Sequence, residues 1–78
     1  MATLDTLKLG MRARIVDVEG DDGIAIRLME MGVTEGEEIE LVGFAPLGDP
    51  IEFELRGFRL SLRKNEAQRV LIDPPVAP

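Results

Sequence analysis

The chain has 78 residues and a formal net charge of −6, from 9 basic and 15 acidic side chains. It contains neither cysteine nor histidine, which excludes disulfides, thiolate metal sites and catalytic Ser–His or Cys–His pairs. Its acidity opposes contact with a phosphate backbone, so nucleic acid is not an expected partner. The sequence therefore predicts one small domain that is not an enzyme.

The same composition bears on location and ligands. The longest apolar runs fall well short of a membrane span, and residues 1–10 lack the pattern of a signal peptide. Small secreted domains usually carry disulfides, which this chain cannot form. The glycines do not follow a phosphate-binding spacing. We expect a cytoplasmic protein that has no cofactor and does not insert directly into a membrane.

The chain begins with a predicted lead-in and a first strand. Residues 1–10 suit an irregular or single-turn segment whose leucines reach the core. Residues 11–18 are rich in β-branched side chains and predict a strand. The alternation of polar and apolar residues slips at Val16, which indicates a bulge or a strong bend there.

A helix is predicted next, over about residues 22–31. An aspartate in the turn 20–23 can accept hydrogen bonds from the free amides at the helix start. Three apolar residues at helical spacing mark the buried face: Ile24, Leu28 and Met31. Arg27 and Glu30 are expected to form a weak surface ion pair. Gly32 provides the left-handed residue that ends the helix.

A second strand and a rigid loop follow. Residues 37–44 alternate outward Glu38 and Glu40 with apolar residues, and the alternation slips at Val42. Slips in both strands indicate strongly coiled strands in a small β-barrel. Residues 45–50 contain two prolines and one glycine, which predicts a stiff loop.

A β-hairpin is predicted over residues 51–62. Residues 51–55 and 58–62 alternate cleanly around a two-residue turn at Arg56 and Gly57. This register joins apolar residues with one another and opposite charges with one another: Leu55 with Phe58, Phe53 with Leu60, Ile51 with Leu62 and Glu54 with Arg59.

The end of the chain completes the expected fold. Residues 64–67 predict a short helical turn and residues 69–73 a last strand. Residues 74–78 predict a flexible, proline-rich tail that cannot join a sheet. The sequence thus predicts a mainly β domain over residues 1–73, built as a five-stranded barrel with one inserted helix.

Three stretches carry a resemblance to a known family. Residues 27–36 hold an arginine–leucine pair, a glycine and a turn glycine, and residues 45–50 and 60–67 form a loop and a closing signature. Together they resemble the bacterial ferrous iron transport protein A (FeoA) family over roughly residues 4–73. The resemblance implies an SH3-like barrel. It also implies a cytoplasmic accessory protein that binds and modulates a FeoB-type membrane GTPase-permease for ferrous iron.

We predict four residues that contact such a partner: Met29, Leu47, Arg59 and Arg63. Met29 is offset from the buried helix face, and Leu47 lies at the tip of a stiff loop that loses little entropy on docking. The two arginines belong to a basic segment over residues 56–69 that would raise the association rate. Weak homo-oligomerisation stays open.

Two other hypotheses stay open. One is a divalent-metal-sensing regulatory domain, related to the C-terminal domain of metal-dependent repressors, that uses Glu38 and Glu40. Carboxylates alone bind ferrous iron weakly because imidazole and thiolate ligands are missing, so we assign no metal ligand. The other is an SH3-like receptor for proline-rich peptides. It ranks last because such grooves are lined by aromatic residues, and this chain has no Trp or Tyr.

Overall fold

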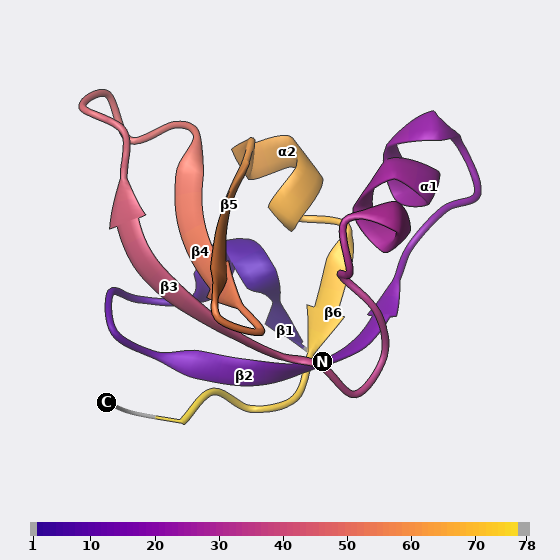
Figure 1. Cartoon of the computed structure of the whole chain (residues 1–78), viewed down its shortest axis with the longest axis horizontal. Helices are drawn as coiled ribbons and strands as arrows, with labels where there is room; N and C mark the ends of the chain where they lie inside the picture. The colour runs from indigo at the N-terminus through magenta and orange to yellow at the C-terminus, as the bar shows by residue number, and fades with distance from the viewer. Residues whose placement is uncertain (1, 77–78) are drawn as a thin grey trace.

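A computed structural model describes residues 2–76 of the chain. Within this range the strands form one antiparallel sheet in the order β1-β6-β2-β3-β4-β5, which coils into a small barrel (Figure 1). The strands are β1 (Ala2–Thr3), β2 (Arg12–Val18), β3 (Glu38–Phe44), β4 (Ile51–Leu55), β5 (Phe58–Leu62) and β6 (Val70–Ile72). The helices are the 3-10 turn η1 (Leu4–Thr6), α1 (Gly23–Glu30) and α2 (Lys64–Ala67). The predicted mainly β fold with one inserted helix is confirmed.

The lead-in adds a strand that the sequence did not predict. Ala2 and Thr3 pair with β6, and two residues are too few to show an alternation. Leu4 and Leu7 are buried as predicted. Leu9 is not, because 61% of it is exposed.

Both predicted slips and the hairpin register are confirmed. The register shifts between Ile15 and Asp17 in β2 and between Leu41 and Gly43 in β3. All four predicted cross-strand pairs of β4 and β5 are present. Arg56 has a φ of 55° and Gly57 a φ of 83°, so both turn residues are left-handed. Such a turn matches the right-handed twist of the two strands.

The start of α1 is fixed by an ion pair to a distant residue. Asp22 caps the helix by accepting from the Ala25 amide at 3.2 Å. It also accepts two hydrogen bonds from the Arg69 guanidinium, at 2.6 and 2.8 Å. These hydrogen bonds lower the pKa of Asp22 below its ordinary 3.8, and the bond from Arg69 has the largest effect. Gly32, with a φ of 96°, follows the helix as predicted.

A second ion pair joins α1 to α2. Arg27 pairs with Glu66 and not with Glu30, so the predicted surface pair is wrong. Glu66 is the one buried charged residue among residues 2–76, and its Oε1 accepts the Arg63 amide at 2.8 Å. The prediction failed because helical spacing describes only neighbours on the same helix, whereas α2 comes close through the fold.

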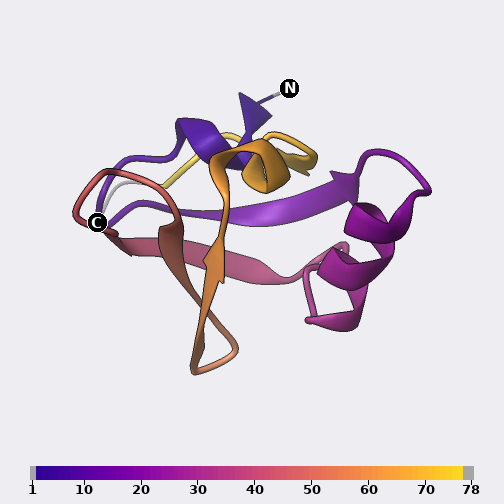
Figure 2. The ribbon, with the colours of Figure 1, turned by 90° about the horizontal axis from the view of Figure 1, so that it is seen from above.

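The core lies inside the coiled sheet and is closed by α1 at one end. Phe53 is its largest fully buried side chain, and Ala25 and Leu28 reach it from the helix. Figures 1 and 2 show α1 standing beyond the ends of β2 and β3. No helix in the described part of the chain is long and apolar enough to cross a bilayer.

The described part of the tail does pair with the sheet, contrary to the prediction. The Arg12 amide donates to the Val76 carbonyl at 3.1 Å, and the Val76 amide donates back at 2.7 Å. Pro74 and Pro75 lack a donor, but Val76 has one, and this restores pairing beyond them. Residues 77–78 of the predicted flexible tail lie outside the described residues.

Candidate functional site

The four residues predicted to contact a partner are exposed, but the fold separates them. Met29 lies on the last turn of α1 and is 43% exposed, whereas Leu47 lies in the β3–β4 loop and is 96% exposed. Figures 1 and 2 place α1 and this loop at opposite ends of the molecule. Arg59 lies on β5, and Arg63 directly follows this strand. The four predicted contact residues therefore do not form one surface: Met29 and Leu47 lie at opposite ends, and the two arginines lie on or next to β5.

Other exposed apolar residues lie at the same end of the molecule as Leu47. The Gly10 amide donates to the Leu41 carbonyl at 2.9 Å, and Val76 pairs with Arg12, so three chain segments meet where β2 begins and β3 ends. Four exposed apolar residues belong to these segments and to the β3–β4 loop, and we call them the loop-end patch: Leu9, Phe44, Leu47 and Val76. They are spread along this end of the molecule, because the β3–β4 loop and the tail lie at its two extremes (Figure 1). The sequence analysis found only Leu47, since exposure beside a turn has no periodic signal.

Other exposed apolar residues lie near Met29 at the opposite end of the molecule. The Gly32 amide donates to the Met29 carbonyl at 3.0 Å, and a Cβ on Gly32 would lie 3.9 Å from Cζ of Phe58. The hairpin tip therefore reaches the end of α1. We call the exposed apolar residues here the helix-end patch: Ile26, Met29 and Phe58. Phe58 was predicted only as the apolar partner of Leu55, yet it is 44% exposed because it lies next to the hairpin turn.

The basic segment over residues 56–69 is largely neutralised by the fold. Three of its arginines have acidic partners: Arg56 with Glu37 at 3.1 Å, Arg59 with Glu52 at 3.8 Å and Arg69 with Asp22 at 2.6 Å. Arg63 and Lys64 are exposed and form no ion pair with residues 2–76. The predicted basic face is thus reduced to the end of β5 and the start of α2.

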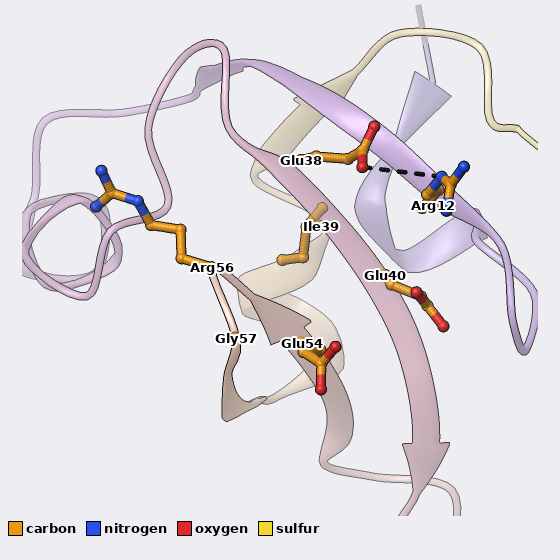
Figure 3. A pocket seen from close by; sticks show the side chains of 7 residues that line it. All are labelled: Arg12, Glu38, Ile39, Glu40, Glu54, Arg56 and Gly57. Carbon is orange, nitrogen blue, oxygen red and sulfur yellow. Dashed lines mark ion pairs between the residues drawn. The ribbon is translucent and has the colours of Figure 1, made fainter.

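An open, charged pocket of about 140 Å³ lies on β2, β3 and β4 (Figure 3). Cross-strand register places Glu40 between Arg12 and Glu54, and Nε of Arg12 lies 3.8 Å from Oε1 of Glu38. No three side chains of the described residues are arranged to hold a metal ion. Glu38 and Glu40, the two residues of the metal-sensing hypothesis, both line this pocket.

Exposed apolar side chains are found at both ends of the domain. Leu47, the most exposed of them, lies in a loop that backbone hydrogen bonds hold. The β3–β4 loop is closed by hydrogen bonds from Ala45 to the Pro50 carbonyl at 3.0 Å and from Gly48 to the Ala45 carbonyl at 2.8 Å. Exposed apolar residues that gather in one region mark interaction sites, whereas single ones are ordinary on a protein surface. The loop-end and helix-end patches are therefore the candidate sites.

Comparison with known proteins connects this fold to iron transport. Residues 2–74 match the family model described as the FeoA domain. The chain is 36% identical over 70 residues to the Fe(2+) transport protein A/Fe(2+) transporter FeoB fusion protein of Porphyromonas gingivalis (strain ATCC BAA-308 / W83). The match covers 90% of this chain and 8% of that protein, so the chain spans a small part of the length of this relative.

Solved structures agree with the family model. FeoA of Stenotrophomonas maltophilia, a zinc complex described as an SH3 domain protein, matches with a TM-score of 0.82 and 36% identity. That match covers 94% of this chain and 91% of the other. Iron(II) transport protein A of Clostridium thermocellum matches with a TM-score of 0.86 and 39% identity, over 92% of this chain and 44% of the other. The predicted SH3-like fold is confirmed.

Proposed function

The chain belongs to the FeoA family, and on this premise we propose that it is a cytoplasmic accessory protein of ferrous iron transport that binds and modulates a FeoB-type membrane GTPase-permease. The observation that carries the proposal is the Porphyromonas relative, which joins FeoA and FeoB in one chain. A covalent link keeps two modules at high effective concentration, which favours their association.

The surfaces of the domain support a binding role. Leu47 offers nearly its whole side chain at the tip of a loop closed by hydrogen bonds, so little entropy is lost when it docks. We propose that the β3–β4 loop side of the loop-end patch contacts the transporter, with Leu47 as the principal residue. The domain contributes no catalytic group, and any GTP chemistry belongs to the partner.

The variant Leu47→Asp tests this assignment. Because Leu47 is 96% exposed, the substitution should leave the free energy of unfolding unchanged within about 0.5 kcal/mol. A charge in an apolar contact should weaken capture of the transporter from detergent-solubilised membranes by about ten-fold or more. Ferrous uptake should fall in cells that carry this variant as their only copy.

A matched control adds the same charge elsewhere. Gln68→Glu changes an exposed residue at the end of α2 and should leave both capture and uptake at the wild-type level. Capture is measured with and without a non-hydrolysable GTP analogue. Normal uptake with Leu47→Asp would refute the loop-end patch. If the wild-type chain captures the transporter neither with nor without the analogue, the proposed function is refuted.

A further inference from the structure

The sheet has a free edge at β5. The sheet order ends there, and β4 is the only strand among residues 2–76 that pairs with it. Residues that flank a two-residue hairpin turn exchange hydrogen bonds, so Phe58 faces β4 with its backbone groups and the direction then alternates. The backbone groups of Arg59 and Ser61 therefore point away from β4. Neither forms a backbone hydrogen bond to another segment of the described chain.

Basic side chains line this edge. Arg59, Ser61 and Arg63 alternate along the outer face, so neighbouring members lie about 6–7 Å apart. Arg59 has only a long contact to Glu52, at 3.8 Å, and Arg63 has no acidic partner within residues 2–76. On the inner face Phe58 is partly exposed. The edge thus offers hydrogen-bonding groups, positive charge on one face and an apolar ring on the other.

The existing neighbour of β5 shows which sequence fits beside it. β4 alternates apolar and acidic residues, places Glu54 opposite Arg59 and covers Leu60 with Phe53. A strand on the open side of β5 would meet Arg59 and Ser61 on one face and the apolar residues of β5 on the other. Cross-strand pairs of this kind favour opposite charges and apolar contacts.

We infer that the free edge of β5 binds an extended segment of a partner protein in which acidic and apolar residues alternate, by adding that segment to the sheet. Edge-strand addition takes its affinity from backbone hydrogen bonds and its specificity from alternate side chains. The inference rests on the proposed function only in taking the partner to be a protein of the transport system. It uses a surface other than the loop-end patch.

The charges argue against a second copy as the occupant. Two antiparallel β5 edges would bring Arg59 and Arg63 of both copies together, and like charges across a strand pair oppose pairing. The other edge of the sheet, β1, is two residues long and carries no charge. Arginines on an edge strand discourage pairing with neutral and basic segments, whereas they attract acidic ones, so they select an acidic occupant.

A peptide titration tests the inference on the full chain. The probe is a blocked peptide with the sequence Gly-Ile-Glu-Phe-Glu-Leu-Gly, and its control carries lysine in place of both glutamates. We expect the acidic peptide to shift the amide resonances of Arg59 and Ser61 and to slow their hydrogen exchange. The lysine peptide should do neither. Absence of these shifts at millimolar acidic peptide, or equal binding of both peptides, would overturn the inference.

Backbone and charge variants separate the two parts of the interaction. Ser61→Pro removes the outward amide, which an edge strand tolerates, and should weaken binding about ten-fold, whereas Ser61→Ala should bind as the wild type does. Arg63→Glu should also weaken binding, and Arg14→Glu on β2 makes the same charge change away from the edge and should not. Should Ser61→Pro not fold, as judged from its amide spectrum, Arg63→Glu against Arg14→Glu decides the matter.

Capture of the transporter distinguishes this inference from the proposed function. When the wild-type chain captures the transporter and both Ser61→Pro and Arg63→Glu capture it equally well, the edge inference is refuted and the proposed function stands. When the wild-type chain does not capture the transporter but binds the acidic peptide as described, the proposed function is refuted and the edge inference stands. Loss of capture with Ser61→Pro but not with Ser61→Ala supports both.

Discussion

Glu66 is the charged residue whose replacement should cost the most stability. Its side chain is 7% exposed, pairs with Arg27 and accepts the Arg63 amide at 2.8 Å. Glu66→Ala removes both interactions and leaves the amide donor without its partner. Glu66→Gln removes only the charge, since the amide oxygen of glutamine still accepts a hydrogen bond.

The expected magnitudes follow from these contacts. A donor left unsatisfied costs about 1–3 kcal/mol. The ion pair adds about 1 kcal/mol, the upper end of the range for exposed pairs, because Glu66 is buried although the Arg27 side chain is 57% exposed. We therefore expect a loss of about 2–4 kcal/mol for Glu66→Ala and about 1 kcal/mol for Glu66→Gln. A domain of this size has roughly 4–12 kcal/mol in total, so the alanine variant should melt roughly 10–30 °C lower.

Urea unfolding followed by far-ultraviolet circular dichroism measures these losses, since the chain has no Trp or Tyr for fluorescence. The matched control is Glu30→Gln, because Glu30 is the partner that helical spacing predicted for Arg27. It should change the free energy of unfolding by less than about 0.5 kcal/mol. An equal loss for Glu30→Gln and Glu66→Gln, or a loss below about 1 kcal/mol for Glu66→Ala, would refute this account of the α1–α2 contact.

Two further predictions concern the ends of α1. Arg69 lowers the pKa of Asp22 below 3.8, so this carboxylate stabilises the fold above its unfolded pKa and loses that effect as pH falls through the folded value. The difference in melting temperature between wild type and Asp22→Asn should therefore be constant near neutrality and shrink below pH of about 4; a difference that does not change with pH contradicts it. Gly23→Ala should stabilise by about 0.4–1 kcal/mol, because φ is not positive there and a Cβ would meet open space. Gly32→Ala should destabilise by about 1–2 kcal/mol, since φ is 96° and the Cβ would lie 3.4 Å from Cδ2 of Leu55. Urea unfolding measures the change in the free energy of unfolding for both variants, and changes of the same sign would contradict this prediction.

The sequence predicted the features that depend on near neighbours. The hairpin register followed from alternation around a two-residue turn, and both slips in alternation became register shifts. The helix was placed by its cap, its apolar spacing and Gly32. Each of these signals lies within about ten residues of the feature that it predicts, so local rules were sufficient.

The features that the sequence missed depend on contacts between distant segments. An aspartate of the turn 20–23 was predicted as a cap, but the bonds of Asp22 to Arg69 cross 47 positions. Arg27 was assigned a partner on its own helix, and the true partner lies on α2. The loop-end patch likewise collects residues from the lead-in, the β3 end and the tail. Local periodicity says which face of an element is buried, but not which elements meet.

The contrast between an acidic and a basic segment shows why this matters for function. In the linear sequence, residues 17–40 and 56–69 look like two faces of opposite charge, which favours long-range steering of a partner. The fold instead sets the two segments against each other, as in the pairs Arg56 with Glu37 and Arg69 with Asp22. The paired arginines add little to the long-range attraction of an acidic partner. Affinity must then come mainly from the apolar ends, while Arg63 and the open edge of β5 determine which partner segment fits.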